Sequence, residues 1–139
     1  MFVYGEKSSR ELATCHNQLQ YVFKEVLRFA DHSIVKGHRN KEAQNLAFDQ
    51  GFSKIKWPDG NHNSRPSTAL DAKPYPLSND RIESMRQLQY FGGIVLGVAF
   101  VHGITLRWGG DWNRNHDLSD QSFNDLYHFE LVNPFPPLR

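Results

Sequence analysis

Apolar residues spaced three and four apart predict a first helix over residues 8–29, capped by Ser8 or Ser9. The face that this helix would bury comprises Leu12, Leu19, Val22, Phe23, Val26 and Leu27. Cys15 falls in the same helical pattern, where a small buried thiol is more common than a reactive one. We therefore expect this helix to be part of the scaffold.

The middle of the chain combines short elements with a long loop. The pattern predicts a strand at residues 34–35, a helix at 41–50 that ends on Gly51, and a strand at 68–72. Residues 52–66 are rich in Pro, Gly, Asn and Ser and keep no apolar period, so they are predicted to form a loop. This loop contains His62.

A long apolar helix is predicted over residues 80–102. Its continuously apolar part, residues 90–101, is about twelve residues long, whereas a membrane span needs about twenty. We therefore expect a buried central helix. A strand at 104–108 follows, and a turn at 122–127 leads into a last strand that carries His128.

The composition is that of a single globular domain over residues 1–139. Apolar residues make up 39% and charged residues 22%, which excludes a disordered chain. The net charge of +1 provides no broad field for holding nucleic acid or an anionic membrane. With Cys15 alone, no intramolecular disulfide forms. The first residues lack the segments of a secretory signal, so we expect the chain to stay in the cytoplasm until something releases it.

Two histidines and two aspartates between residues 62 and 128 suggest metal-assisted hydrolysis. His62, Asp71 and His128 match the number and type of protein ligands at a catalytic zinc site. Asp125 would then take the proton from the metal-activated water. Residues three apart in a strand point to opposite faces, so we expect Asp125 on the turn at residues 122–127. The alternative is that these are surface or capping residues that fall together by chance.

Two further features are candidates for binding. Arg39 stands at a strand-to-helix junction, where its fork of donors suits a substrate carboxylate, although an isolated arginine is more often a solvated surface residue. Oxygen-bearing side chains also recur at every second position, as in calcium-binding loops, at Asp111, Asn113, Asn115, Asp117 and Ser119. The calcium pattern is partial, because His116 and Ser122 replace its glycine and its bidentate glutamate. The alternative is a loop of Asx turns that binds nothing.

Several short blocks occur along the chain in a characteristic order. They are Gly37-His38-Arg39, Gln44, Gly51-Phe52-Ser53-Lys54, the run from His62 to Asp71, Pro74-Tyr75-Pro76, Leu106-Arg107-Trp108-Gly109-Gly110-Asp111-Trp112, and Asp125-Leu126-Tyr127-His128-Phe129-Glu130-Leu131. Taken together, these blocks resemble the D-alanyl-D-alanine carboxypeptidase / L-alanyl-D-glutamate endopeptidase family of zinc peptidases, and more narrowly the single-domain endolysins of tailed phages. The resemblance extends from about Ser8 to Val132.

The resemblance implies an α+β fold of the hedgehog/D-Ala-D-Ala-peptidase type, a small antiparallel sheet with helices on one side. It implies that His62, Asp71 and His128 bind zinc and that Asp125 is the base, although many members have Glu there. It assigns Arg39 to the substrate carboxylate or the scissile carbonyl, and we expect Gln44 and Ser53 to bind substrate as well. Many members have a shorter run between the His and Asp ligands, with a glycine in it, whereas the run in this chain contains Pro66-Ser67. In some members, the loop that corresponds to Asp111–Asp117 is linked to calcium.

Three functions follow as hypotheses. The first is a phage endolysin that cleaves the L-Ala–D-Glu bond of the peptidoglycan stem peptide. The second is a D-Ala-D-Ala carboxypeptidase with the same site, and the third is a non-enzymatic zinc- or calcium-binding module. For the first, we expect a monomer that accumulates in the host cytoplasm and reaches the periplasm and cell wall through a separate holin-type pore.

Overall fold

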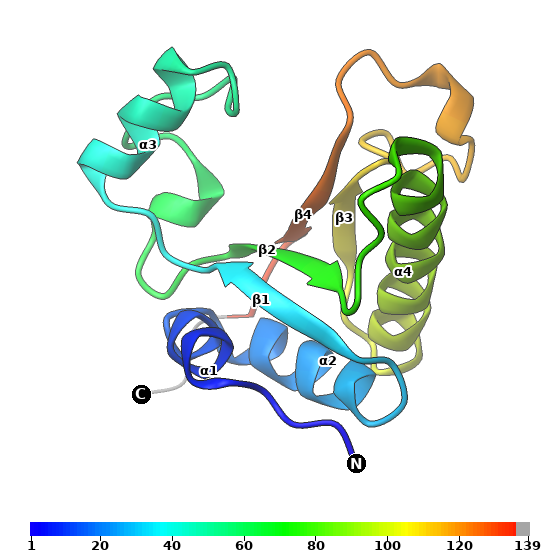
Figure 1. Cartoon of the computed structure of the whole chain (residues 1–139). Helices are drawn as coiled ribbons and strands as arrows, with labels where there is room; N and C mark the ends of the chain where they lie inside the picture. Colours follow the sequence, from blue (N-terminus) through cyan, green and yellow to red (C-terminus); the bar gives the residue numbers. More distant parts are fainter. Residues whose placement is uncertain (136–139) are drawn as a thin grey trace.

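The computed structural model describes residues 1–135, in which an antiparallel sheet of four strands is covered by helices (Figure 1). The strands lie in the order β1-β2-β4-β3, so β2 and β4 form the centre of the sheet. Their bounds are His32–Lys36 for β1, Ala69–Pro74 for β2, Leu106–Gly109 for β3 and Asp125–Leu131 for β4. Strand β2 is therefore longer than the predicted strand at 68–72.

Helices α2 (Asn17–Leu27) and α4 (Arg81–Val101) cover one face of the sheet. Phe129 of β4 is central to this core, because its ring lies 5.4 Å from Phe23, 6.1 Å from Phe91 and 6.4 Å from Trp108. Side chains alternate between the faces of a strand, so the neighbours of Phe129 point to the opposite face. The expected α+β arrangement, with helices packed on one side, is confirmed.

The predicted first helix is wrong as a single element. It is divided into α1 (Glu6–Ala13) and α2, with a break at Thr14, Cys15 and His16. The backbone N–H of His16 donates to the carbonyl of Ser67 at 2.8 Å, and its ring Nδ1 caps α2 by accepting from the N–H of Gln18 at 3.0 Å. The predicted apolar face is nevertheless buried throughout, and Cys15 is a buried thiol whose pKa is raised to about 12 by burial.

Helix α3 (Lys41–Asp49) confirms the predicted second helix. Its last residue is Asp49, and Gly51, just after the C-cap Gln50, has a φ of +80° that suits glycine. The loop that follows contains a short 3-10 turn, η1 (Asn61–Asn63), which carries His62. In Figure 1, α3 and this loop lie on the other side of the central strands from α4. A second 3-10 turn, η2 (Leu118–Asp120), lies before β4.

Helix α4 occupies the predicted position, with Asp80 as its N-cap, but it is not a buried central helix. It buries only one side, formed by Leu88, Phe91, Gly92, Val95 and Ala99. Phe100 and Val101 on the outer side are 82% and 79% exposed. A bilayer-spanning helix needs a longer apolar run than any helix within residues 1–135 provides.

A bulge in β4 corrects the expected location of Asp125. Trp108 pairs with Phe129, but the next residue, Gly109, pairs with Asp125. Between these two pairs, β3 advances by one residue while β4 advances by four, so residues 126–128 of β4 have no partner on β3 and form the bulge. The strand begins at Asp125 and not after a turn that extends to Tyr127, and the bulge allows Asp125 and His128 to line the same cleft.

Candidate metal centre and active site

Three donor atoms from distant parts of the chain meet at the centre of the site. His62 Nε2 lies 3.2 Å from His128 Nδ1 and 3.3 Å from Asp71 Oδ1, and the last two atoms are 3.5 Å apart. Within residues 1–135, this is the only group of three or more His, Cys, Asp or Glu side chains close enough to share a metal ion. The structure thus brings together all three residues that the sequence predicts as ligands.

The register of the central strands produces this convergence. Asp71 of β2 pairs directly with His128 of β4, so their side chains leave the sheet from neighbouring positions on one face. His62 reaches the same point from η1, which is attached to the sheet edge where the N–H of Arg39 donates to the carbonyl of His62 at 2.7 Å.

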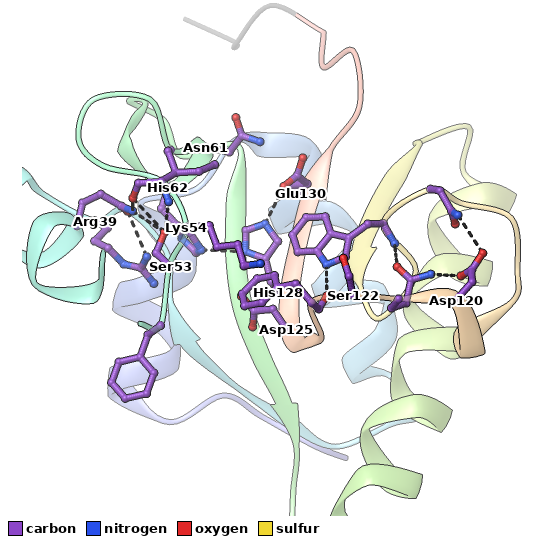
Figure 2. A pocket seen from close by; sticks show the side chains of 18 residues that line it. Arg39, Ser53, Lys54, Asn61, His62, Asp120, Ser122, Asp125, His128 and Glu130 are labelled. Carbon is purple, nitrogen blue, oxygen red and sulfur yellow. Dashed lines mark hydrogen bonds and ion pairs between the residues drawn. The ribbon is translucent and has the colours of Figure 1, made fainter. Parts of the chain in front are cut away.

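Hydrogen bonds on the outer side of each imidazole ring orient the two histidines. Nδ1 of His62 lies 2.7 Å from the carbonyl oxygen of Gly37. Nε2 of His128 lies 2.8 Å from Oε1 of Glu130, a contact that Figure 2 shows. Both partners are acceptors, so the outer nitrogen of each ring carries the hydrogen. When each ring is neutral, the inner nitrogens, His62 Nε2 and His128 Nδ1, keep their lone pairs for a metal.

The centre fits a small divalent ion. Asp71 Oδ1 is buried and makes no hydrogen bond within the described residues, although it faces both imidazoles. A buried carboxylate oxygen without a partner is costly, and a cation would supply that partner. Four ligands at about 2.0–2.1 Å in a tetrahedron lie about 3.3–3.4 Å apart, which is close to the separations of the three donor atoms.

The charges of the centre depend on one another. Burial opposes ionisation of both Asp71 and His128, but the hydrogen bond and attraction between the two charged groups outweigh it. The pKa of Asp71 is held below its usual range, and the pKa of His128 is raised to about 9. Burial likewise opposes ionisation of Glu130, yet His128 and Arg107 lower the pKa of Glu130 to about 2. Arg107 Nη2 donates to Glu130 Oε2 at 2.8 Å, so this carboxylate is fixed on both sides.

Asp125 lies beside the donor atoms without being one of them. Burial raises the pKa of Asp125, and the negative charge of Asp71 raises it further, while His128, His62 and Arg39 partly offset both effects. A carboxylate with a raised pKa is a better proton acceptor near neutral pH than a fully solvated one. The geometry therefore suits Asp125 to the predicted role of base.

Arg39 is predicted to bind substrate, and the structure places it against a metal-ligand candidate. Its Nη2 donates to Asp71 Oδ2 at 3.4 Å and its Nη1 donates to Gln44 Oε1 at 3.2 Å. Gln44 is 1% exposed and donates to Ser53 Oγ at 2.9 Å. Arg39, Gln44 and Ser53 all line the cleft and are joined to one another by these hydrogen bonds. Direct contact of these three residues with substrate stays a prediction.

The cleft has a volume of about 490 Å³ and runs between the loop after α3 and the loop before β4 (Figure 2). One wall is aromatic: Trp112 stacks on Phe123 with ring centroids 6.2 Å apart and lies 5.4 Å from the ring of His128. Sequence reasoning missed Glu130, Trp112, Phe123 and the orienting carbonyl of Gly37. Glu130 could have been found from its spacing, because residues i and i+2 of a strand share a face.

The candidate calcium loop is closed by its own hydrogen bonds. Asp111 accepts from the backbone N–H groups of Asn115 and His116, at 3.3 and 2.9 Å. Asp117 accepts from the N–H of Ser119 at 2.9 Å. The amides of Asn113 and Asn115 donate to Asp120 at 3.1 and 2.6 Å. These contacts match the expected alternative of Asx turns, and calcium binding stays a prediction without support from the geometry.

Comparison with known proteins agrees with this site. Residues 1–132 match the family model described as phage L-alanyl-D-glutamate peptidase. The chain is 33% identical over 141 residues to the L-alanyl-D-glutamate peptidase of Escherichia phage T5, and the match covers 94% of this chain and 98% of that protein.

Two solved structures share the fold. The Serratia marcescens L-Ala D-Glu endopeptidase ChiX matches with a TM-score of 0.68 and 22% identity, over 94% of this chain and 90% of that one. The vancomycin-resistance D,D-dipeptidase VanXYg, solved with a D-Ala-D-Ala phosphinate analogue, matches with a TM-score of 0.53 and 20% identity, over 88% of this chain and 49% of that one. On the family match and the phage relative, this chain is a peptidase and belongs to the phage L-alanyl-D-glutamate peptidase family.

Proposed function

We propose that this chain is a zinc-dependent endolysin that hydrolyses the L-Ala–D-Glu bond of the peptidoglycan stem peptide, with His62, Asp71 and His128 as the zinc ligands. The observation that carries the proposal is the unpartnered, buried Oδ1 of Asp71, which faces two oriented histidines in a chain of this peptidase family. Imidazole and carboxylate donors with an open side are typical of catalytic zinc.

The chain's own residues would carry the proton and the developing charge. Zinc, when bound, lowers the pKa of water to about 7 and polarises a carbonyl. Asp125 accepts the proton of the attacking water and then delivers it to the departing amine. Arg39 places a fixed positive charge beside Asp71, where it stabilises negative charge that develops on the scissile carbonyl oxygen.

The phage family also supports a biological setting for this activity. We propose that the chain accumulates as a monomer in the cytoplasm of the host bacterium. A separate holin-type protein would then open the inner membrane, and the peptidase would reach the periplasm and the wall at lysis. Expression alone should leave cells intact, whereas expression followed by permeabilisation of the inner membrane should lyse them.

A digest of purified peptidoglycan tests the bond that is cleaved. The zinc-loaded protein should release new N-terminal D-Glu and new C-terminal L-Ala, both identified by mass, and the Asp125→Ala protein should release neither. Release of D-Ala would instead favour the D-Ala-D-Ala carboxypeptidase. A zinc-loaded, folded protein that releases no peptide would favour the non-enzymatic module.

A further inference from the structure

Lys54 supplies the cleft with a positive charge that no other described residue neutralises. Its Nζ lies 4.7 Å above the ring centroid of Phe123, and within residues 1–135 it takes part in no ion pair or hydrogen bond. Arg39, the other cation that lines the cleft, is already held by Asp71 and Gln44. Lys54 is therefore the cleft cation that is available to an anionic ligand.

The contacts of Lys54 place it on the side of the cleft that receives the departing amine. Phe123, which Lys54 covers, lies two residues before Asp125 and stacks on Trp112, whose ring lies beside His128. Asp125 hands its proton to the departing amine in the proposed reaction. The part of the substrate that begins with this amine therefore lies towards Asp125 and the adjoining contact between Lys54 and Phe123. Figure 2 shows Lys54 and Asp125 among the residues that line the cleft.

The substrate has an anionic group at this position. When an L-Ala–D-Glu bond is cleaved, the departing amine is that of glutamate, which has two carboxyl groups. One of them continues the peptide, so the other is free and lies within a few bonds of the amine. A free carboxylate near Asp125 and Asp71 is repelled unless a cation compensates for it.

We propose that Lys54 binds the free carboxylate of the D-Glu residue and is a determinant of specificity for glutamate after the scissile bond. This inference rests on the proposed function. The aromatic face of Phe123 holds the ammonium in the cleft before substrate arrives, because cation–π attraction restricts a side chain that is otherwise flexible.

The chain provides a matched control two residues away. Lys56 Nζ also lies 4.7 Å above an aromatic ring, that of Phe48 on α3, but Lys56 does not line the cleft. Both lysines therefore have the same charge and the same type of aromatic contact on one loop. Replacing Lys56 therefore removes a lysine charge and a cation–π contact, as replacing Lys54 does, but it removes no charge from the cleft.

The experiment compares two stem peptides that differ in one group: a free D-Glu carboxylate in the first and its carboxamide in the second. Rates are measured for the zinc-loaded wild type, Lys54→Gln, Lys54→Arg and Lys56→Gln. The wild type should prefer the carboxylate by about tenfold to hundredfold in kcat/KM, the worth of a charge-assisted hydrogen bond. Lys54→Gln should lose this preference mainly through KM for the carboxylate peptide, and should cleave the carboxamide at the wild-type rate.

Lys54→Arg should keep most of the preference because it keeps the charge, and Lys56→Gln should match the wild type. An equal loss on both peptides in Lys54→Gln, with normal zinc content and melting temperature, would make Lys54 a structural residue and overturn the proposal. So would a wild type that cleaves both peptides equally well. A wild type that cleaves neither peptide at the Ala–Glu bond would overturn the proposed function itself.

Discussion

Nε2 of His128 donates to Oε1 of Glu130 at 2.8 Å, and the two residues lie on the same face of one strand. Glu130 in turn accepts from Arg107 on the neighbouring strand, so the outer hydrogen bond of a metal-ligand candidate is built into the sheet. Carboxylate partners of this kind fix the tautomer of a ligating histidine and make its free nitrogen a stronger ligand.

Glu130→Gln should therefore lower the affinity for zinc by roughly tenfold to hundredfold. The amide oxygen still accepts a hydrogen bond from His128, so activity at saturating zinc should return to within a few-fold of the wild type. Zinc titration with a competing chelator measures the affinity. Glu83→Gln is the control, because Glu83 forms an exposed pair with Arg86 at 3.9 Å and neither residue lines the cleft. Unchanged affinity in Glu130→Gln would mean that the hydrogen bond does not support the metal.

Removal of any metal ligand should abolish activity. His62→Ala, Asp71→Ala and His128→Ala each remove one of three donors that lie within 4.8 Å of one another, so each should lower the zinc content together with the rate. Chelation of the wild type should have the same effect, and added zinc should reverse it. Full activity after exhaustive chelation would refute the zinc mechanism.

Asp125→Asn should separate the chemistry from metal binding. If Asp125 is the base, the variant should keep near-normal zinc content while turnover falls by roughly 10²- to 10⁴-fold. Zinc content, melting temperature and rate are measured on one preparation. Parallel loss of zinc and activity would make Asp125 a ligand, whereas near-normal turnover would make it a structural residue of β4.

Local sequence signals were sufficient to predict the helices that begin after a capping residue. They were also sufficient to identify residue types that can bind a metal. Asn40 and Asp80 accept from the N–H groups of Ala43 and Glu83, and the helices that they cap were predicted correctly. The break before α2 was missed because it depends on Ser67, which is about fifty residues away in the sequence.

The residues of the candidate site likewise fall into those that the sequence could identify and those that depend on tertiary structure. Ligand chemistry and the resemblance to a zinc peptidase family together predicted that His62, Asp71 and His128 converge, and the structure brings the three side chains together. The bulge that turns Asp125 towards the cleft could not, since it depends on how β3 pairs with β4. Lys54 was visible only as part of a family block, because the loops that bring it over Phe123 leave no periodic pattern in the sequence.

Two adjacent glycines of α4 should respond in opposite directions to the same substitution. A Cβ on Gly92 would lie 2.5 Å from the ring of Trp108, whereas a Cβ on Gly93 would meet nothing within 4 Å. Gly92→Ala should destabilise the fold by about 1–3 kcal/mol through overpacking. Gly93→Ala should stabilise it by about 0.5–1 kcal/mol, because alanine favours the helix. Urea unfolding of the two variants measures both effects, and equal changes would contradict the packing of α4 on β3.

His32 should make the fold less stable in mild acid. It is 3% exposed, its Nδ1 lies 2.9 Å from the carbonyl oxygen of Ala30, and its Nε2 lies 2.6 Å from the hydroxyl of Tyr4. Burial lowers the pKa of His32, and the carbonyl of Ala30 and the charge of Asp31 only partly offset this. The unfolded chain therefore binds a proton below about pH 6.5 that the folded chain resists, so this contribution to stability is present above pH 6.5 and is lost as the pH falls towards the folded pKa.

His32→Phe checks this sign. The variant is less stable at neutral pH because Tyr4 and Ala30 lose their partner, but its unfolding free energy should fall less steeply between pH 7 and pH 5. Urea unfolding of the metal-free proteins gives both curves, and the other histidines contribute equally to each. A difference between the curves that stays constant across this range would show that His32 does not resist protonation.

The direct pairing of Asp71 with His128 also has a consequence for synthesis of the protein. A slip of one residue between β2 and β4 would turn one of these side chains into the core, so the candidate metal centre exists in a single register. Strand β4 is the last of the four to be translated, and it carries Asp125, His128 and Glu130 together. A nascent chain that has been translated through β3 still lacks the proposed base and one of the proposed ligands. The candidate site is therefore complete only when β4 has joined the sheet between β2 and β3.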